Sequence, residues 1–199
     1  MVILIDNGHG YDTSGKKSPD GKLKEYKYTR EIAADVVAIL KSYGYDARRI
    51  VTEENDITLG ERVRRINKIC TQYGSSNVLM VSIHCNAAGN GSWLNAQGWE
   101  AYSTKGKTNS DILAECLYKR AEKNFKGRKI RKDTTDGDSD KEANFYIILH
   151  AKCPSVLTEN FFMDNKSDCE YMLSEIGRHN ITRTHVEGII DYIQSKIKK

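Results

Sequence analysis

The sequence lacks any long apolar stretch. No run exceeds about five residues, whereas a membrane-spanning helix needs roughly 20. It contains only two prolines and 15 glycines among 199 residues, and 39% of the residues are hydrophobic. Those values exclude collagen-like and wholly disordered chains. Because no repeat, linker or change of composition divides the chain, we expect one globular domain over residues 1–199 that buries its own core.

Disulfide patterns and export signals are missing as well. The five cysteines include no C-x-x-C pair and are odd in number, which argues against a disulfide framework and suits a reducing compartment. The N-terminus has neither the basic leader nor the apolar stretch of a signal peptide. We therefore expect a protein made in the cytoplasm.

The excess of positive charge is small. Lys and Arg number 31 against 27 Asp and Glu, a net charge of +4. A dedicated nucleic-acid binder concentrates more basic residues on one face, so we expect no nucleic-acid partner. The one dense basic run, Lys126–Lys132, is interpreted as a solvated loop; the alternative is a surface that attracts an anionic polymer.

Short strand-like segments alternate with helical ones along the chain. The near-continuous apolar run Val78–Ile83 is typical of a strand covered on both faces. Residue types and periodicity predict strands at Val2–Asp6, Ala47–Val51, Val78–Ile83, Gly98–Ser103, Phe145–Leu149 and Ser155–Phe161. They predict helices at Thr29–Tyr43, Leu59–Tyr73, Ser110–Phe125, Asp168–Ile176 and Ile181–Ile197. This alternation favours an α/β fold with a mostly parallel central sheet.

Several polar residues lie at or near the carboxyl ends of predicted strands, where α/β folds have their functional sites. His9 follows the first strand, His84 ends the buried one, and Glu25 precedes the first helix. A histidine at a strand end is often merely hydrogen-bonded, and a glutamate at a helix start favours the helix dipole. Glu159 lies inside an apolar strand, where a carboxylate costs several kcal/mol unless it is paired or bound to metal.

Taken in order, these segments resemble the zinc-dependent N-acetylmuramoyl-L-alanine amidases, which cleave bacterial peptidoglycan. The resemblance rests on Asp6–Gly10, Glu25, Ser82–Ala87 and Pro154–Glu159, and further on Asp56, Leu59, Arg62 and Asn165. It implies a single α/β domain around a mostly parallel sheet of six strands.

The resemblance also implies a site and a reaction. His9, Glu25 and His84 correspond to the three ligands of one Zn²⁺ ion per chain, and Glu159 to the catalytic carboxylate. The bond cleaved would be the amide between N-acetylmuramic acid and the first L-alanine of the stem peptide. Peptidoglycan or a muropeptide would be the partner, and the protein would act on the cell wall, as autolysins or phage endolysins do, as a monomer.

Three positions depart from the family pattern. Tyr11 replaces a second glycine after Gly10, Phe161 replaces the glycine two residues after Glu159, and Glu53 stands where an arginine is frequent. These departures bear on substrate detail rather than on the proposed ligands.

Other interpretations remain open at this point. Cys85 adjoins His84, which suggests a Cys–His nucleophile, although adjacent strand residues point to opposite faces. The whole domain could instead bind the wall without catalysis, or bind a small anion at the glycine-flanked His9. His150 could line the cleft, and Trp93, Trp99 and Tyr102 could stack on sugars, with Trp93 the best candidate because it lies in a loop.

Overall fold

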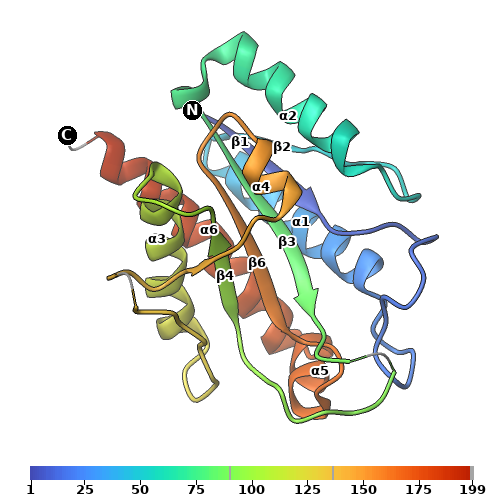
Figure 1. The fold of residues 1–199 in the computed structure, drawn as a ribbon. Helices are drawn as coiled ribbons and strands as arrows, with labels where there is room; N and C mark the ends of the chain where they lie inside the picture. Colours follow the sequence, from blue (N-terminus) through green and yellow to red (C-terminus); the bar gives the residue numbers. More distant parts are fainter. Residues whose placement is uncertain (90, 136, 198–199) are drawn as a thin grey trace.

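A six-stranded sheet forms the centre of the computed structural model, which describes residues 1–89, 91–135 and 137–197 (Figure 1). The strand order is β2-β1-β3-β6-β4-β5. The first four strands in this order are parallel, β4 is antiparallel to β6, and β5 is parallel to β4. The strands are β1 (Val2–Asn7), β2 (Asp46–Arg49), β3 (Val78–Asn86), β4 (Glu100–Ser103), β5 (Lys141–Glu142) and β6 (Ser155–Phe162). The predicted mostly parallel α/β sheet is confirmed.

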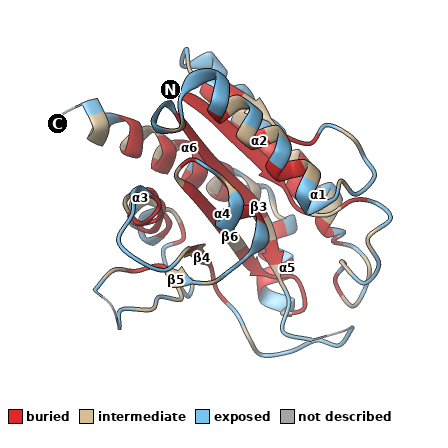
Figure 2. Ribbon diagram, turned by 45° about the horizontal axis from the view of Figure 1, so that its top comes forward, coloured by how far each residue is buried: buried red, intermediate tan, exposed pale blue. Residues whose placement is uncertain are grey.

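Helices cover both faces of the sheet, so its central strands are buried (Figure 2). One apolar cluster joins the sheet to α1, α3, α5 and α6, and a smaller one joins the other face to α2 and α4. The helices are α1 (Glu25–Ser42), α2 (Leu59–Tyr73), α3 (Asn109–Asn124), α4 (Tyr146–His150), α5 (Lys166–Leu173) and α6 (Glu175–Ile197). No helix in the described ranges is long and apolar enough to cross a bilayer.

Local sequence accounts for most of these elements. Thr58 caps α2 by accepting a hydrogen bond from the Glu61 amide, and Gly74 is the C-cap, so the helix has the predicted bounds Leu59–Tyr73. At α3 the N-cap is Thr108, in a reciprocal capping box with Asp111, so the helix begins at Asn109, one residue before the predicted start at Ser110. This capping box supplies acceptors for two backbone amides at the start of α3 that have no partner within the helix.

The predicted strand at Phe145–Leu149 is wrong, because these residues belong to the short helix α4. Ile147 and Ile148 are buried side by side, and their neighbours on both sides are exposed. Consecutive buried residues fit one helical turn packed on α2 and β6, whereas a half-buried strand would alternate. The sixth strand is instead β5, two residues long, in a stretch that the sequence marks only as polar.

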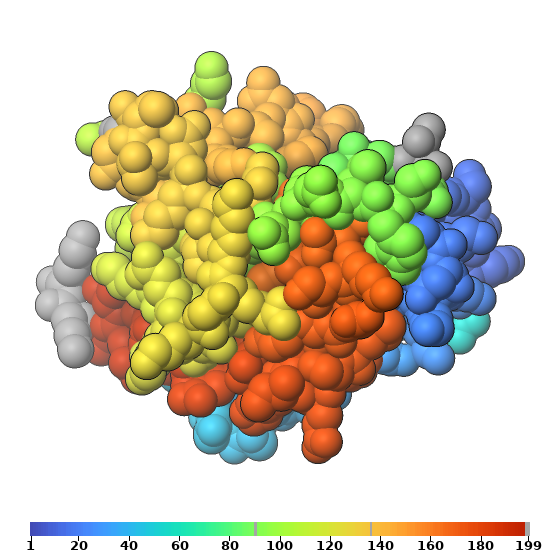
Figure 3. Space-filling view, turned by 90° about the horizontal axis from the view of Figure 1, so that it is seen from below, coloured from blue at the N-terminus to red at the C-terminus, as the bar shows by residue number. Residues whose placement is uncertain are grey.

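The register of the sheet determines where the predicted site residues meet. β1 pairs with β3 through Asn7 and Ile83, and β3 pairs with β6 through His84 and Glu159. The carboxyl ends of these three strands therefore form one edge. Figure 3 views that end, where the loop after β3 crosses beside α5.

Candidate active site

The loop after β1 presents His9 in an unusual backbone conformation. His9 has φ +59°, in the left-handed region, and Gly8 donates a hydrogen bond from its amide to Ile83 O at 3.0 Å. Two buried guanidinium groups hold the His9 carbonyl, from Arg30 Nη1 at 2.8 Å and Arg62 Nη2 at 3.4 Å. This support fixes a conformation that costs a non-glycine residue about 1–3 kcal/mol.

Glu25 is the first residue of α1, and its side chain is only 1% exposed. Its Oε1 accepts a hydrogen bond from the Cys85 amide at 3.0 Å. Its Oε2 has no hydrogen-bond partner among the described residues. A buried carboxylate oxygen without a donor costs stability, which points to a missing partner of positive charge.

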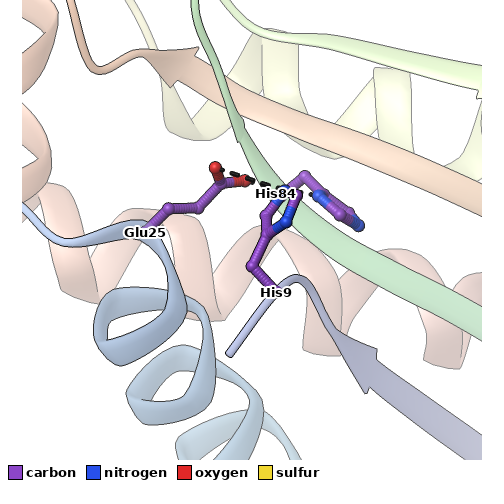
Figure 4. A group of neighbouring side chains, drawn as sticks. All are labelled: His9, Glu25 and His84. Carbon is purple, nitrogen blue, oxygen red and sulfur yellow. Dashed lines mark ion pairs between the residues drawn. The ribbon is translucent and has the colours of Figure 1, made fainter. Parts of the chain in front are cut away.

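His9 and His84 complete the group around that carboxylate (Figure 4). Nε2 of His9 lies 3.5 Å from Glu25 Oε2, and Nδ1 of His84 lies 3.3 Å from Glu25 Oε1. One ligand atom from each residue lies within 4.8 Å of the others, as a shared metal ion requires. Two imidazoles and one carboxylate also leave a fourth position open on a tetrahedral zinc ion. The residues therefore fit the metal that the resemblance implies.

Burial and mutual charge set the protonation of this group. Burial lowers the pKa of His9 to about 4, despite the opposing effect of Glu25. For His84, burial would lower the pKa, but the hydrogen bond to Glu25 and the nearby carboxylates leave it above the usual value. For Glu25, burial acts in the raising direction, yet the two histidines leave its pKa below the usual value. A metal ion competes with protons for the histidine nitrogens, so its affinity falls at low pH.

Glu159 lies next to this group on β6, paired in register with His84. The residue as a whole is half-buried, but its Oε2 is shut off from solvent and has no hydrogen-bond partner within the described ranges. Burial raises the pKa of Glu159 to about 8, with the charges of Glu25 and Glu100 adding to the shift. A carboxyl with a pKa near neutrality beside candidate metal ligands is suited to proton transfer.

The raised pKa predicts a pH-dependent stability. Between pH 4.5 and 8 the folded metal-free protein holds a proton on Glu159 that the unfolded chain has lost, so stability falls as pH rises. The Glu159→Gln variant has no such proton to release when it unfolds. Its gain in unfolding free energy over the wild type should grow from pH 5 to pH 8, by at most about 1.4 kcal/mol per pH unit. Urea unfolding in chelator measures this difference, and a gain that is constant with pH would contradict the burial of an uncharged Glu159.

Gly8 makes room for the His84 ring. A Cβ built on Gly8 would lie 2.4 Å from Cε1 and 2.5 Å from Nδ1 of His84. Gly8→Ala should therefore displace the ring and weaken Zn²⁺ binding by at least about tenfold. Gly60→Ala is the matched control, because a Cβ there meets open space at the start of α2. Competition with a chromogenic chelator measures both affinities; equal affinities would show that the ring position does not matter.

Asp56 and Arg62, which match the family pattern, help to hold the loop that carries His9. Arg62 donates from Nη1 to Asp6 Oδ1 at 2.7 Å and from Nη2 to Asp56 Oδ1 at 3.0 Å. The other oxygen of Asp6 accepts from Ser82 Oγ at 2.6 Å. This buried network ties the start of α2 to the ends of β1 and β3. A pocket of about 200 Å³ beside His9 and His84 opens on this side.

The three departures from the family pattern have different consequences in the structure. Tyr11 is largely exposed. Glu53 forms an ion pair with Arg65 at 2.7 Å. Phe161 has φ +68°, a conformation that glycine adopts without strain. Its ring is buried and packs edge-on against Phe125, with ring centres 5.0 Å apart, which holds the chain in this conformation.

Two of the open alternatives are also settled by position. Cys85 lies in the apolar cluster on the face opposite α2 and α4, and burial raises the pKa of its thiol well above the usual value. It is therefore not poised as a nucleophile beside His84. His150 ends α4 and is exposed, and it does not line the pocket beside His84, although Ile147 of the same helix does.

The three aromatic residues proposed as sugar contacts lie in different environments in the structure. Trp99 is buried and donates from Nε1 to Asn160 Oδ1 at 3.0 Å, so it belongs to the core. Trp93 is 40% exposed but lines a separate hollow with Lys22 and α5. Tyr102 is half-buried, and its hydroxyl donates to Glu100 at 2.9 Å. Glu100 is a buried acid that no sequence motif marks, so it is absent from the predicted site.

A group of candidate metal ligands beside a buried carboxyl of raised pKa, at the carboxyl edge of an α/β sheet, is an arrangement suited to metal-assisted hydrolysis. The comparisons with known proteins identify a family of hydrolases. The family described as N-acetylmuramoyl-L-alanine amidase matches residues 3–191. The chain belongs to this family, whose reaction is hydrolysis of the amide between N-acetylmuramic acid and L-alanine in peptidoglycan.

Individual relatives cover nearly the whole chain. It is 27% identical to the endolysin of Bacillus phage SPP1 over 201 residues, which are 99% of this chain and 68% of the endolysin. It is 30% identical to the amidase LytC of Bacillus subtilis over 193 residues, 96% of this chain but 35% of LytC. Among solved structures, an amidase from Clostridium difficile 630 has a TM-score of 0.82 and 25% identity, with 98% of this chain and 97% of that chain covered. AmiC2 of Nostoc punctiforme has a TM-score of 0.79 and 26% identity, with the same coverage.

Proposed function

We propose that the chain hydrolyses this amide with one Zn²⁺ ion held by His9, Glu25 and His84. The observation that carries the proposal is Glu25 Oε2, a buried carboxylate oxygen without a donor that faces His9 Nε2 at 3.5 Å. The third ligand, His84, lies on the other oxygen of the same carboxylate. Imidazole and carboxylate are ligands that zinc accepts in catalytic sites.

Each residue has a separate task in the reaction. Zinc, when bound, supplies a Lewis acid that activates water and polarises the scissile carbonyl. Glu159 accepts a proton from the attacking water and passes it to the nitrogen of the leaving L-alanine. Glu159 must be ionised to accept that proton, and the positive charge of a zinc ion bound to the adjacent His84 would lower the pKa of Glu159. Arg30 and Arg62 hold the His9 loop in place.

The same proposal extends to the setting of the enzyme. We place its substrate in the bacterial cell wall, as peptidoglycan or a released muropeptide, in line with the endolysin and the cell wall amidases among its relatives. We treat residues 1–199 as one catalytic domain that acts as a monomer. All the proposed ligands and the carboxylate come from a single copy of the chain.

Metal removal and return tests the proposal. After exhaustive chelation, wall hydrolysis should be lost while circular dichroism shows a folded protein, because the apolar clusters do not depend on metal. Addition of Zn²⁺ should restore activity in proportion to bound metal, up to about one ion per chain. A protein that only binds the wall would sediment with peptidoglycan in both states and cleave it in neither. Full activity with zinc verified absent would contradict the proposal.

A further inference from the structure

A second charged group lies beside Glu159, on the neighbouring strand β4. Glu100 stands opposite Glu159 in the antiparallel register, and such pairs project to one face with Cβ atoms about 5 Å apart. On the other side, the register pairs Glu159 with His84. Glu100 therefore continues the row of polar side chains across the sheet, on the side of Glu159 away from β3.

Glu100 is buried, yet both of its oxygens have donors. Its side chain is 2% exposed. Oε1 accepts from Asn86 Nδ2 at 2.6 Å and from the Tyr102 hydroxyl at 2.9 Å. Oε2 accepts from Arg131 Nε at 2.7 Å and lies 2.6 Å from Lys141 Nζ. Burial alone would raise the pKa of Glu100, but these hydrogen bonds leave it below the usual value, so the carboxylate is ionised.

Arg131 and Lys141 share this one carboxylate, so the group formed by these three side chains has a net charge of +1. One of them, Arg131, comes from the basic run that sequence analysis interprets as a solvated loop. Their side chains remain 30% and 24% exposed for Arg131 and Lys141. The guanidinium uses only Nε on Glu100, so the four N–H donors of its terminal nitrogens lie outside this ion pair.

Aromatic rings also restrict the two cations. The Arg131 guanidinium lies over the Phe162 ring at 5.2 Å, and Lys141 Nζ lies 5.8 Å from the centre of the Tyr102 ring. Such contacts hold cationic groups in place without using their hydrogen-bond donors. Charge neutralisation of Glu100 needs one cation. The second cation, partly exposed and fixed in position, is available to an anion that enters beside Glu159.

We propose that Arg131 and Lys141, positioned by Glu100, form a subsite for a free carboxylate on the peptide part of the substrate. The inference rests on the proposed function, because cleavage at L-alanine places the stem peptide next to Glu159. Stem peptides carry a carboxylate at the second residue and, when the third is diaminopimelate, another there. The planar fork of arginine matches a carboxylate with two parallel hydrogen bonds.

Matched substrates test the subsite. One pair is N-acetylmuramoyl-L-alanyl-D-isoglutamate and its isoglutamine analogue; the second pair adds diaminopimelate with its side-chain carboxylate free or amidated. The wild type should favour the free carboxylate in at least one pair by about tenfold in kcat/KM, mainly through KM, the value of one charge-assisted hydrogen bond. The pair that shows the preference identifies which carboxylate is bound.

Variants separate a binding role from a structural one. Arg131→Gln and Lys141→Gln should each bring the preference towards one by slowing only the carboxylate substrate. Lys119 is an exposed residue on α3, and Lys119→Gln should keep the preference of the wild type. In the wild type alone, raising the salt concentration should reduce the preference, which gives a readout if the variants fold poorly. Equal cleavage of free and amidated members in both pairs would overturn the subsite; cleavage of none of the four would overturn the proposed function itself.

Discussion

Replacement of Glu159 by glutamine is expected to lower amide hydrolysis by at least about 100-fold while the bound zinc stays near one ion per chain. Glutamine keeps the size of the side chain and its hydrogen-bonding capacity but cannot accept the proton. A positioned acid–base group is typically worth about 10²–10⁴-fold, or roughly 3–5 kcal/mol of barrier. Steady-state rates on a muropeptide, with metal content determined on the same sample, measure the effect.

The control for that variant is Glu170→Gln, which removes an exposed carboxylate from α5. It should hydrolyse the substrate at the parental rate. If Glu159→Gln did the same, the base would lie elsewhere. If instead it lost its zinc, Glu159 would be a ligand and the assignment of roles around His84 would need revision.

Replacement of His84 by alanine is expected to remove metal and activity together. It takes away one of three proposed ligands and leaves Glu25 with one fewer donor in a buried setting. Zinc affinity should fall by more than about 100-fold, since even the loss of a residue that only hydrogen-bonds to a metal ligand costs about 10–100-fold. Zinc titration and hydrolysis assays on one preparation measure both, and thermal unfolding of the metal-free protein checks that the fold persists.

His179→Ala is the matched control for that experiment. His179 is an exposed histidine on α6, on the face of the sheet opposite α2 and α4. It should retain the zinc and the activity of the wild type. A His84→Ala protein that kept a full complement of tightly bound zinc would exclude His84 as a ligand.

The candidate ligands stand out in the sequence as polar residues next to strongly patterned elements, and the resemblance alone implies that they bind a metal. His84 ends a run of buried apolar residues, and His9 follows the first strand in a glycine-flanked turn. The meeting of Glu25 with both histidines was implied only by the resemblance, since a turn of α1 and the parallel register bring them together. Periodicity alone does not carry that information.

Other features depended on contacts between distant segments. Phe145–Leu149 is a short apolar run, and such runs do not distinguish a strand from a helical turn until Ile147 and Ile148 have a partner surface. Nothing in the sequence marks Glu100, because its place beside Glu159 depends on the antiparallel register. Its ion pairs with Arg131 and Lys141 also join segments that are distant in sequence. Phe161 was marked by its departure from glycine, but its left-handed backbone is visible only in the structure.

Mass spectrometry of a defined muropeptide digested by the zinc-loaded and the metal-free protein tests the central claim most directly. The account predicts a peptide with a new free L-alanine amino terminus and a sugar that retains its lactyl carboxylate, in the zinc-loaded sample only. Cleavage within the peptide or the glycan, or equal release of free L-alanine peptide by the metal-free protein, would contradict it.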